Sequence, residues 1–177
     1  MPFEGSSGAV FSSDRRYRFA LWRTWDTGNG TVAFIGLNPS AADEHVNDPT
    51  IRRCIGFARS WGYRGLLVGN LFALCATRPE QLKAGGNPVG TGNDLWLERL
   101  AQASVRLLVC WGTHGAFMDR DRAFCANRED LYCLRRNRDG SPAHPLYIRK
   151  DQRPRRWRHD GTGGKRRPAV SPPGPAA

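Results

Sequence analysis

Residues 31–40 read Thr-Val-Ala-Phe-Ile-Gly-Leu-Asn-Pro-Ser, and an apolar run from Val32 to Leu37 ends there in an Asn-Pro turn. A run that is apolar at nearly every position is typical of a strand covered on both faces of its sheet. Proline restricts the residue before it to extended backbone, so Asn38 is expected on a stiff turn directly after the strand. We therefore expect an α/β domain with its functional site built on the loop from Gly36 to Ser40.

Strands and helices are expected to alternate along the rest of the domain. Asp48-Pro49 predicts a helix start, because aspartate is a good N-cap and proline fits the first helical position. Gly62 can end this helix, and Asn93 can cap the next one. Buried strands are predicted at 65–71, 105–111 and 131–134, with a weaker helix at 116–127.

This order predicts an α/β fold with a four-stranded, mostly parallel sheet and helices on both faces. Two β-rich runs, 17–25 and 31–37, flank a Gly/Asn turn and predict an N-terminal antiparallel hairpin. The first run mixes arginines with aromatic residues, which is typical of an edge strand. We divide the chain into a flexible N-terminus (1–14), one domain (15–148) and a tail (149–177).

The tail carries most of the positive charge. It holds nine Lys/Arg and two Asp, and so contributes +7 of the formal net charge of +11. With almost nothing apolar to bury, it is expected to be disordered. Its basic residues indicate either an arm that binds a polyanion such as nucleic acid, or a solvated or non-native end.

Five cysteines without a C-x-x-C pair indicate buried, reduced thiols, and no metal or cofactor is expected. No apolar run approaches the roughly 20 residues that span a membrane, and the first residues lack the pattern of a signal peptide. We expect a cytoplasmic monomer that does not contact a membrane. Phosphate-loop, dinucleotide-binding and serine-hydrolase motifs are missing from the sequence.

Candidate site residues follow from strand order, because ligands bind beyond the carboxyl ends of parallel strands. Asn38 at such an end holds a water or a substrate amide, or else bonds its own backbone. Asn70 reads a ligand edge or makes an internal hydrogen bond. His144 stabilises a developing negative charge or acts as an acid, unless it is an ordinary loop histidine.

The carboxylates nearest to Asn38 in sequence are Asp43 and Asp48. Either is a possible base, but Asp48 is better explained as a helix cap, which leaves Asp43 as the catalytic candidate. Trp111 adjoins an apolar run and is typical of a core residue, and His114 follows it closely enough to share the rim of the site.

The segments together resemble a bacterial family catalogued as domain of unknown function 1643, through G-L-N-P-S-x-A-D, D-P-T-I-R-R-C, W-G-Y, G-N-L-F-A-x-x-A-T, W-G and H-P-L-Y between Tyr17 and Tyr147. Their order is more distantly similar to the uracil-DNA glycosylase superfamily, which implies that superfamily's fold. There, a Gly-x-Asn-Pro type of loop positions the attacking water, a strand-end asparagine reads the base, and the histidine of a His-Pro pair stabilises the departing base. The resemblance implies catalytic roles for Asn38 and His144 and binding roles for Gly36, Leu37, Pro39, Ser40, Asn70, Trp111, Gly112 and Pro145. Asp43 as a further catalytic candidate and His114 as a further binding candidate come from their positions in the sequence alone.

The resulting hypothesis is hydrolysis of an N-glycosidic bond of a base in nucleic acid, with DNA preferred to RNA, or in a nucleotide. The alternative is a non-catalytic module that binds nucleic acid or a nucleotide. The uncharged side chain of Asn38 favours this alternative. A small-molecule hydrolase on the same fold is the third possibility.

Overall fold

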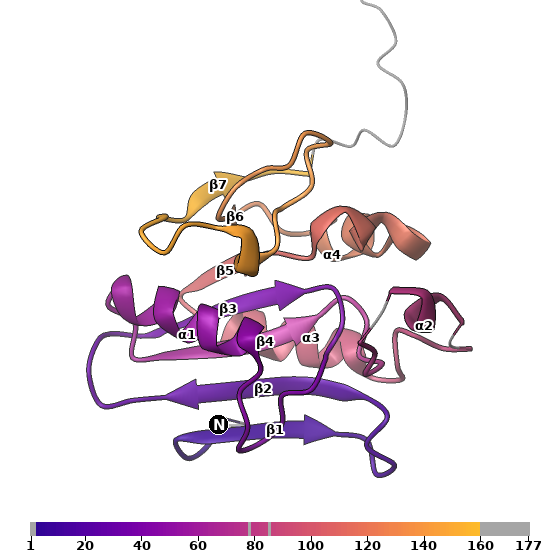
Figure 1. The fold of residues 1–177 in the computed structure, drawn as a ribbon, viewed down its shortest axis with the longest axis horizontal. Coiled ribbons are helices and arrows are strands. Elements are labelled where there is room, and N and C mark those ends of the chain that lie inside the picture. The colour runs from indigo at the N-terminus through magenta and orange to yellow at the C-terminus, as the bar shows by residue number, and fades with distance from the viewer. Residues whose placement is uncertain (1–2, 78, 85, 160–177) are drawn as a thin grey trace, which may run out of the picture.

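A computed structural model describes residues 3–77, 79–84 and 86–159. Its centre is a seven-stranded sheet in the order β1-β2-β4-β3-β5-β6-β7 (Figure 1). The four central strands run parallel, whereas the β1–β2, β2–β4 and β6–β7 pairs are antiparallel. The strands are β1 (Ser7–Phe11), β2 (Arg18–Thr24), β3 (Thr31–Gly36), β4 (Gly65–Asn70), β5 (Arg106–Val109), β6 (Leu131–Cys133) and β7 (Arg155–Trp157).

The mixed α/β class is confirmed, but the prediction of a four-stranded sheet is wrong. Strands β1 and β2 extend the sheet beyond β4, and β7 extends it beyond β6. These added strands are antiparallel to their neighbours, so the complete sheet is mixed.

The predicted hairpin between residues 17–25 and 31–37 is also wrong. Both edges of β3 are occupied by parallel partners, β4 and β5, so no edge of β3 remains for β2. Strand β2 instead lies between β1 and β4, with Leu21 opposite Val68, and is therefore not an edge strand. The antiparallel N-terminal pair is formed by β1 and β2.

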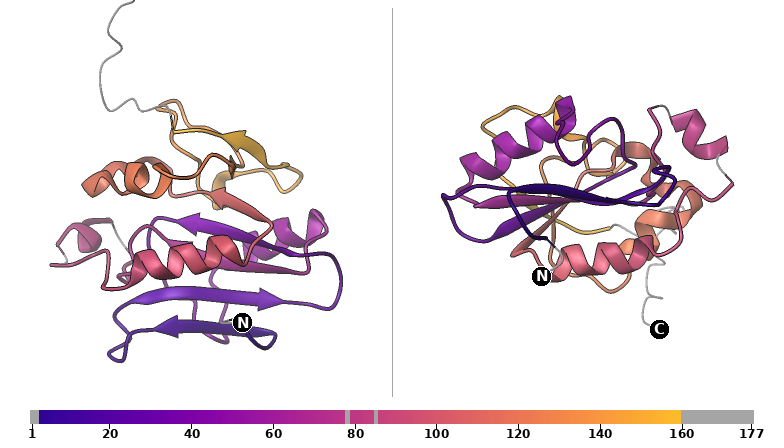
Figure 2. Two further views of the ribbon diagram at one scale, coloured as in Figure 1. Left: turned by 180° about the vertical axis from the view of Figure 1, so that it is seen from behind. Right: turned by 90° about the horizontal axis from the view of Figure 1, so that it is seen from below.

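Helices cover both faces of the sheet (Figure 2). Successive residues of β3 point to opposite faces, as the pleat of a strand requires. Phe34 belongs to the core cluster that includes residues of α1 (Pro49–Ser60), whereas Ile35 belongs to the cluster that includes residues of α3 (Asn93–Gln102) and α4 (Arg120–Cys125). The central strands are thereby buried from both sides, which explains their nearly continuous apolar sequence.

The predicted start of α1 is confirmed, since the Asp48 Oδ1 accepts a hydrogen bond of 2.8 Å from the Ile51 N–H. The start of α3 differs, because Gly92 is its N-cap and Asn93 its first residue. The Asn93 side chain instead donates to the backbone carbonyls of Asn70 and Leu71 at the end of β4.

The weak helix expected at 116–127 is divided. A 3-10 segment, η1 (Gly112–Asp119), precedes α4, and two residues with φ near +50°, Met118 and Asp119, separate them. Two further short elements, α2 (Pro79–Ala84) and η2 (Pro145–Tyr147), lie in connections.

Among the described residues, secondary structure extends past the expected boundaries of 15 and 148. Strand β1 lies within the stretch expected to be a flexible N-terminus, and β7 lies within the expected tail, where Trp157 is only 2% exposed. The rest of that tail, residues 160–177, lies outside the described residues. Within the described residues, no helix has the length and apolar character that a membrane span requires.

Candidate functional site

A cavity of about 470 Å³, which we call the strand-end pocket, opens at the carboxyl ends of β3, β4 and β5. It gathers most of the residues that the sequence predicted to form a site. Its lining includes the predicted residues Gly36, Leu37, Asn38, Ser40, Asn70, Trp111, Gly112, His114 and His144, and in addition Arg18, Asp48, Thr50, Thr77, Cys54, Cys110 and Tyr147.

Asn70 is a buried polar side chain aimed into this pocket. The residue is 5% exposed, and its carboxamide has no hydrogen-bond partner in the part of the chain that the structure describes. Gly36 lies opposite it in the register of β3 and β4, and a Cβ atom at Gly36 would come within 2.7 Å of the Asn70 Nδ2. The glycine therefore provides the space that the carboxamide occupies.

Asn38 is partly engaged in holding the loop together. Its Nδ2 donates hydrogen bonds to the Ala76 carbonyl (2.6 Å) and to the Pro39 carbonyl (3.0 Å). The Oδ1 atom has no hydrogen-bond partner among the described residues. The amide nitrogen thus joins the 36–40 loop to the segment after β4, while the oxygen remains as an acceptor at the pocket.

His144 lies where the chain enters η2 and is half-buried. Its Nδ1 accepts a long hydrogen bond of 3.4 Å from the Leu146 N–H. Burial lowers the pKa of His144, an effect that the charge of Asp48 partly opposes. The neutral ring with an unprotonated Nδ1 carries its proton on Nε2, which makes that nitrogen a hydrogen-bond donor.

Of the two candidate carboxylates, Asp48 lies at the pocket and Asp43 does not. Asp43 does not line the pocket; its Oδ1 accepts from the backbone N–H groups of His45 (2.8 Å) and Val46 (2.7 Å), and these bonds lower its pKa. Asp48 does line the pocket. Its Oδ1 caps α1, and its Oδ2 has no hydrogen-bond partner in the described part of the chain. Asp48 therefore combines the capping role with a carboxylate oxygen at the cavity.

The two predicted prolines shape the site without lining it. Pro39 is buried and accepts the Ala76 N–H at its carbonyl, and Pro145 is the buried first residue of η2. Around the opening, Ser40 and His114 are exposed, and Tyr147 is 77% exposed. The rim thus offers one large aromatic ring next to His144.

Arg18 is a lining residue that the sequence analysis missed. It is 3% exposed although it carries a charge, and burial lowers its pKa. The only sequence signal was an arginine inside a run of apolar and aromatic residues. That signal indicated an edge strand. In the structure β2 instead pairs with β1 on one side and β4 on the other, so this arginine is buried.

The thiols at the pocket are poor candidates for nucleophiles. Cys54 and Cys110 are both buried and free, and burial raises the pKa of Cys110 to about 12 and that of Cys54 well above its usual value. A nucleophilic cysteine needs a stabilised thiolate, and these surroundings disfavour one. The described residues also contain no cluster of three His, Cys, Asp or Glu that would hold a metal ion.

The family described as "Protein of unknown function (DUF1643)" matches residues 18–146. The chain belongs to this family. Neither a curated protein nor a solved structure matches the chain significantly. The DUF1643 segment runs from β2 to η2 and includes every residue named above as lining the pocket except Tyr147, whereas β1 and β7 lie outside it.

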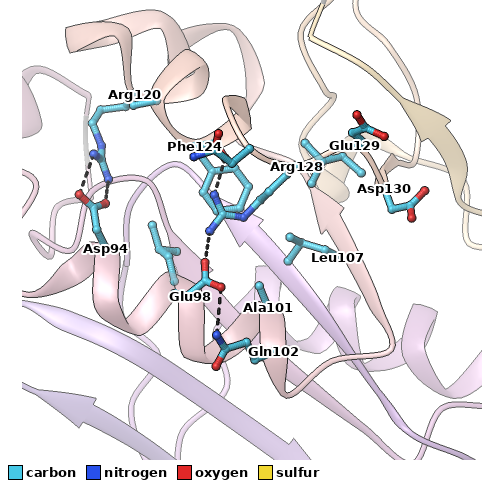
Figure 3. A pocket seen from close by; sticks show the side chains of 14 residues that line it. Asp94, Glu98, Ala101, Gln102, Leu107, Arg120, Phe124, Arg128, Glu129 and Asp130 are labelled. Atoms are coloured by element: carbon cyan, nitrogen blue, oxygen red, sulfur yellow. Dashed lines mark hydrogen bonds and ion pairs between the residues drawn. The ribbon is translucent and has the colours of Figure 1, made fainter.

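The DUF1643 domain also has a larger cavity, of about 840 Å³, between α3 and α4 (Figure 3). Its charged side chains bind one another: Arg120 pairs with Asp94, and Arg128 pairs with Glu98 at 2.6 Å. Glu98 also accepts a hydrogen bond from Gln102. These contacts pair both arginines of this cavity with carboxylates of α3, so size alone does not make this groove a ligand site. The strand-end pocket is smaller, but it is lined by polar side chains whose free atoms have no hydrogen-bond partner among the described residues, among them Asn70 and Arg18, and we assign the functional site to it.

Proposed function

We propose that the strand-end pocket binds a nucleobase and hydrolyses its N-glycosidic bond, in a nucleic acid or in a nucleotide. The Asn70 carboxamide is the observation that carries this proposal, because it is buried, faces the pocket and has no hydrogen-bond partner among the described residues. Buried polar groups are nearly always hydrogen-bonded. A carboxamide offers a donor and an acceptor side by side, which matches the edge of a base.

The chemistry needs a polarised water and a stabilised leaving base. In our proposal, the Asp48 Oδ2 and the Asn38 Oδ1 accept hydrogen bonds from the attacking water, and Asp48 takes up its proton. The Nε2–H of His144 donates to the departing base, on which negative charge develops. The neutral form of His144 suits this role, since burial lowers its pKa. A base within a duplex must leave the stack before it reaches such a pocket, so unpaired substrates are favoured.

The test is release of free base from nucleoside monophosphates and from uracil-containing single- and double-stranded DNA. Asp48→Asn is the sharpest variant, because asparagine caps a helix about as well as aspartate but lacks the charge. We expect it to lower the rate at least about 100-fold, a typical contribution of a general base. Asp26→Asn, at an exposed position outside the pocket, is the matched control and should retain full activity. Wild-type protein that releases no more base than Asp48→Asn from any of these substrates would rule out the activity.

A non-catalytic binding module is the second candidate. It is favoured by the hydrogen bonds of the Asn38 Nδ2 to Ala76 and Pro39, which give this residue a structural role. This candidate predicts saturable binding of a nucleotide or of nucleic acid without turnover. Removing residues 160–177, which include Lys165, Arg166 and Arg167, tests whether the basic C-terminal end contributes to DNA binding. This deletion keeps β7 in place. A salt dependence of DNA binding that is unchanged by this deletion would exclude the end as a binding arm.

A further inference from the structure

Arg18 brings a positive charge to the strand-end pocket and has no ion-pair partner among the described residues. The residue is 3% exposed. Its Nη1 donates to the Ala42 carbonyl at 2.7 Å, and this is the side chain's only hydrogen bond within the described residues. No carboxylate in the described part of the chain forms an ion pair with it. Asp48 lines the same pocket and interacts with Arg18 through its charge, but its Oδ1 is committed to the cap of α1.

Arg23, on the same strand, shows how this protein satisfies a buried guanidinium. It is 7% exposed, and its Nε donates to the Asn47 side chain at 2.9 Å. Its two Nη atoms donate to four backbone carbonyls, among them that of Asp43 at 2.6 Å. Both arginines donate to the loop before α1. Every guanidinium nitrogen of Arg23 donates a hydrogen bond, whereas in Arg18 only Nη1 does so. The remaining N–H groups of Arg18 face the cavity.

A buried charge is costly unless it is paired and hydrogen-bonded. A guanidinium presents five N–H donors in a planar fork that fits the oxygens of a phosphate or a carboxylate. The partner that Arg18 lacks is therefore an oxyanion, which would bind to Arg18 within the pocket.

We propose that Arg18 binds a terminal oxyanion, a phosphoryl or carboxylate group, of a small-molecule ligand in the strand-end pocket. The inference rests on the proposed function of this pocket, and it narrows the substrate to a free anionic compound such as a nucleoside monophosphate. A terminal oxyanion can enter a recess, whereas an internal phosphodiester carries a nucleotide on both sides. The cavity of about 470 Å³ also lies within the size range of small-molecule sites.

Binding of inorganic phosphate, measured by calorimetry at fixed ionic strength, tests this independently of the identity of the base. Charge-assisted hydrogen bonds of this kind are worth about tenfold to 100-fold in affinity. We expect Arg18→Gln to weaken phosphate binding by at least about tenfold. Arg99→Gln removes the same charge at an exposed position over Trp96, outside the pocket, and should bind as the wild type does. Acetate, as a competitor, shows whether the site prefers a carboxylate.

A second measurement needs no variant and covers the case in which Arg18→Gln fails to fold. Wild-type protein should bind at least one of the four common nucleoside 5′-monophosphates at least about tenfold more tightly than the matching nucleoside. Equal affinities, or an absence of binding to both phosphate and acetate, would overturn the inference. Tight phosphate binding that Arg18→Gln leaves intact would also overturn it. The same holds if an oligonucleotide without terminal phosphates binds as tightly as the monophosphate and its binding depends on Arg18.

The inference and the proposed function fail in different experiments. Arg18-dependent phosphate binding without release of base would refute glycosidic hydrolysis and leave the oxyanion site standing. Release of base from a neutral nucleoside as rapid as from its monophosphate would refute the oxyanion site and leave the hydrolysis standing.

Discussion

Gly36 and Asn70 form a pair in which the smallest residue makes room for a polar side chain. A Cβ at Gly36 would lie 2.7 Å from the Asn70 Nδ2, closer than real Cβ contacts come. The backbone of Gly36 is not in the left-handed region, so the requirement for glycine is one of space. Any side chain at position 36 must therefore displace the carboxamide that faces the pocket.

We expect Gly36→Ala to weaken ligand binding by up to about tenfold, the value of one hydrogen bond, because it moves Asn70. Gly56→Ala is the matched control, since it adds the same methyl group within α1, where a Cβ meets no atom within 4 Å. Alanine also favours helix, so Gly56→Ala should raise the free energy of unfolding by about 1 kcal/mol and leave binding unchanged. Calorimetry and chemical denaturation measure the two effects. Equal binding by both variants would show that Asn70 does not contact the ligand.

At this scale the sequence predicted which residues gather at the pocket, and the roles of these residues stay predictions. Asn38, Asn70 and His144 follow strands or enter turns, and a parallel sheet brings such residues to one edge. The position of Asp43 outside the pocket and the presence of Arg18 in it were not foreseen, for one reason. Both depend on how the loop before α1 folds against β2, and no local pattern encodes such a long-range contact.

The short element η2 depends on the protonation state of the residue that begins it. His144 Nδ1 accepts from the Leu146 N–H, and a protonated ring cannot accept this bond. Burial lowers the pKa of His144 in the folded protein, so the unfolded chain binds the proton first as the pH falls. Stability from the neutral ring is complete above the unfolded pKa of about 6.5 and is lost as the pH drops through the folded value.

We therefore expect the free energy of unfolding to decrease between pH 7 and pH 5 by more in the wild type than in His144→Asn. Asparagine keeps an N-cap acceptor at this position and does not titrate. Chemical denaturation at several pH values measures the difference. Identical pH dependence in the two proteins would show that His144 is not coupled to folding.

Two elements with strong local signals were predicted well. The Asp-Pro start of α1 and the apolar run of β4 each lie within a few residues, and both occur in the structure. Partners of strands are set by distant segments, which explains the error over β2 and β3. Strands β1 and β7 are short, five and three residues, and contain too few alternating apolar positions to be recognised.

At the scale of the whole molecule, the chain after the DUF1643 segment returns to complete the core. Trp157 of β7 packs edge-to-face on Trp111, with ring centroids 5.6 Å apart, and Trp111 lines the strand-end pocket. The Trp157 indole also donates to the Gly140 carbonyl at 3.1 Å. The last described strand thus supports the wall of the site from behind.

Trp157→Ala should lower the free energy of unfolding by about 3–5 kcal/mol, as is typical when a buried tryptophan is removed. Weaker ligand binding should accompany this loss, because Trp111 is left with a cavity behind it. Tyr147→Ala removes an exposed ring and should change stability by less than about 0.5 kcal/mol. Thermal and chemical denaturation provide the comparison, and a cost below 1 kcal/mol for Trp157→Ala would contradict this assignment of β7 to the core.

Strands β1 and β7 are the two outer strands of the sheet. The outer edge of a sheet exposes unpaired N–H and C=O groups, to which a strand of another copy can add and begin aggregation. Here β7 follows Pro154 and carries the exposed Arg155 and Arg156, while β1 pairs with an irregular register between Val10 and Phe11. Short, charged or kinked edges are poor templates for such addition. The apolar parallel strands are thereby kept out of reach of other copies, which favours a protein that stays dispersed at high concentration.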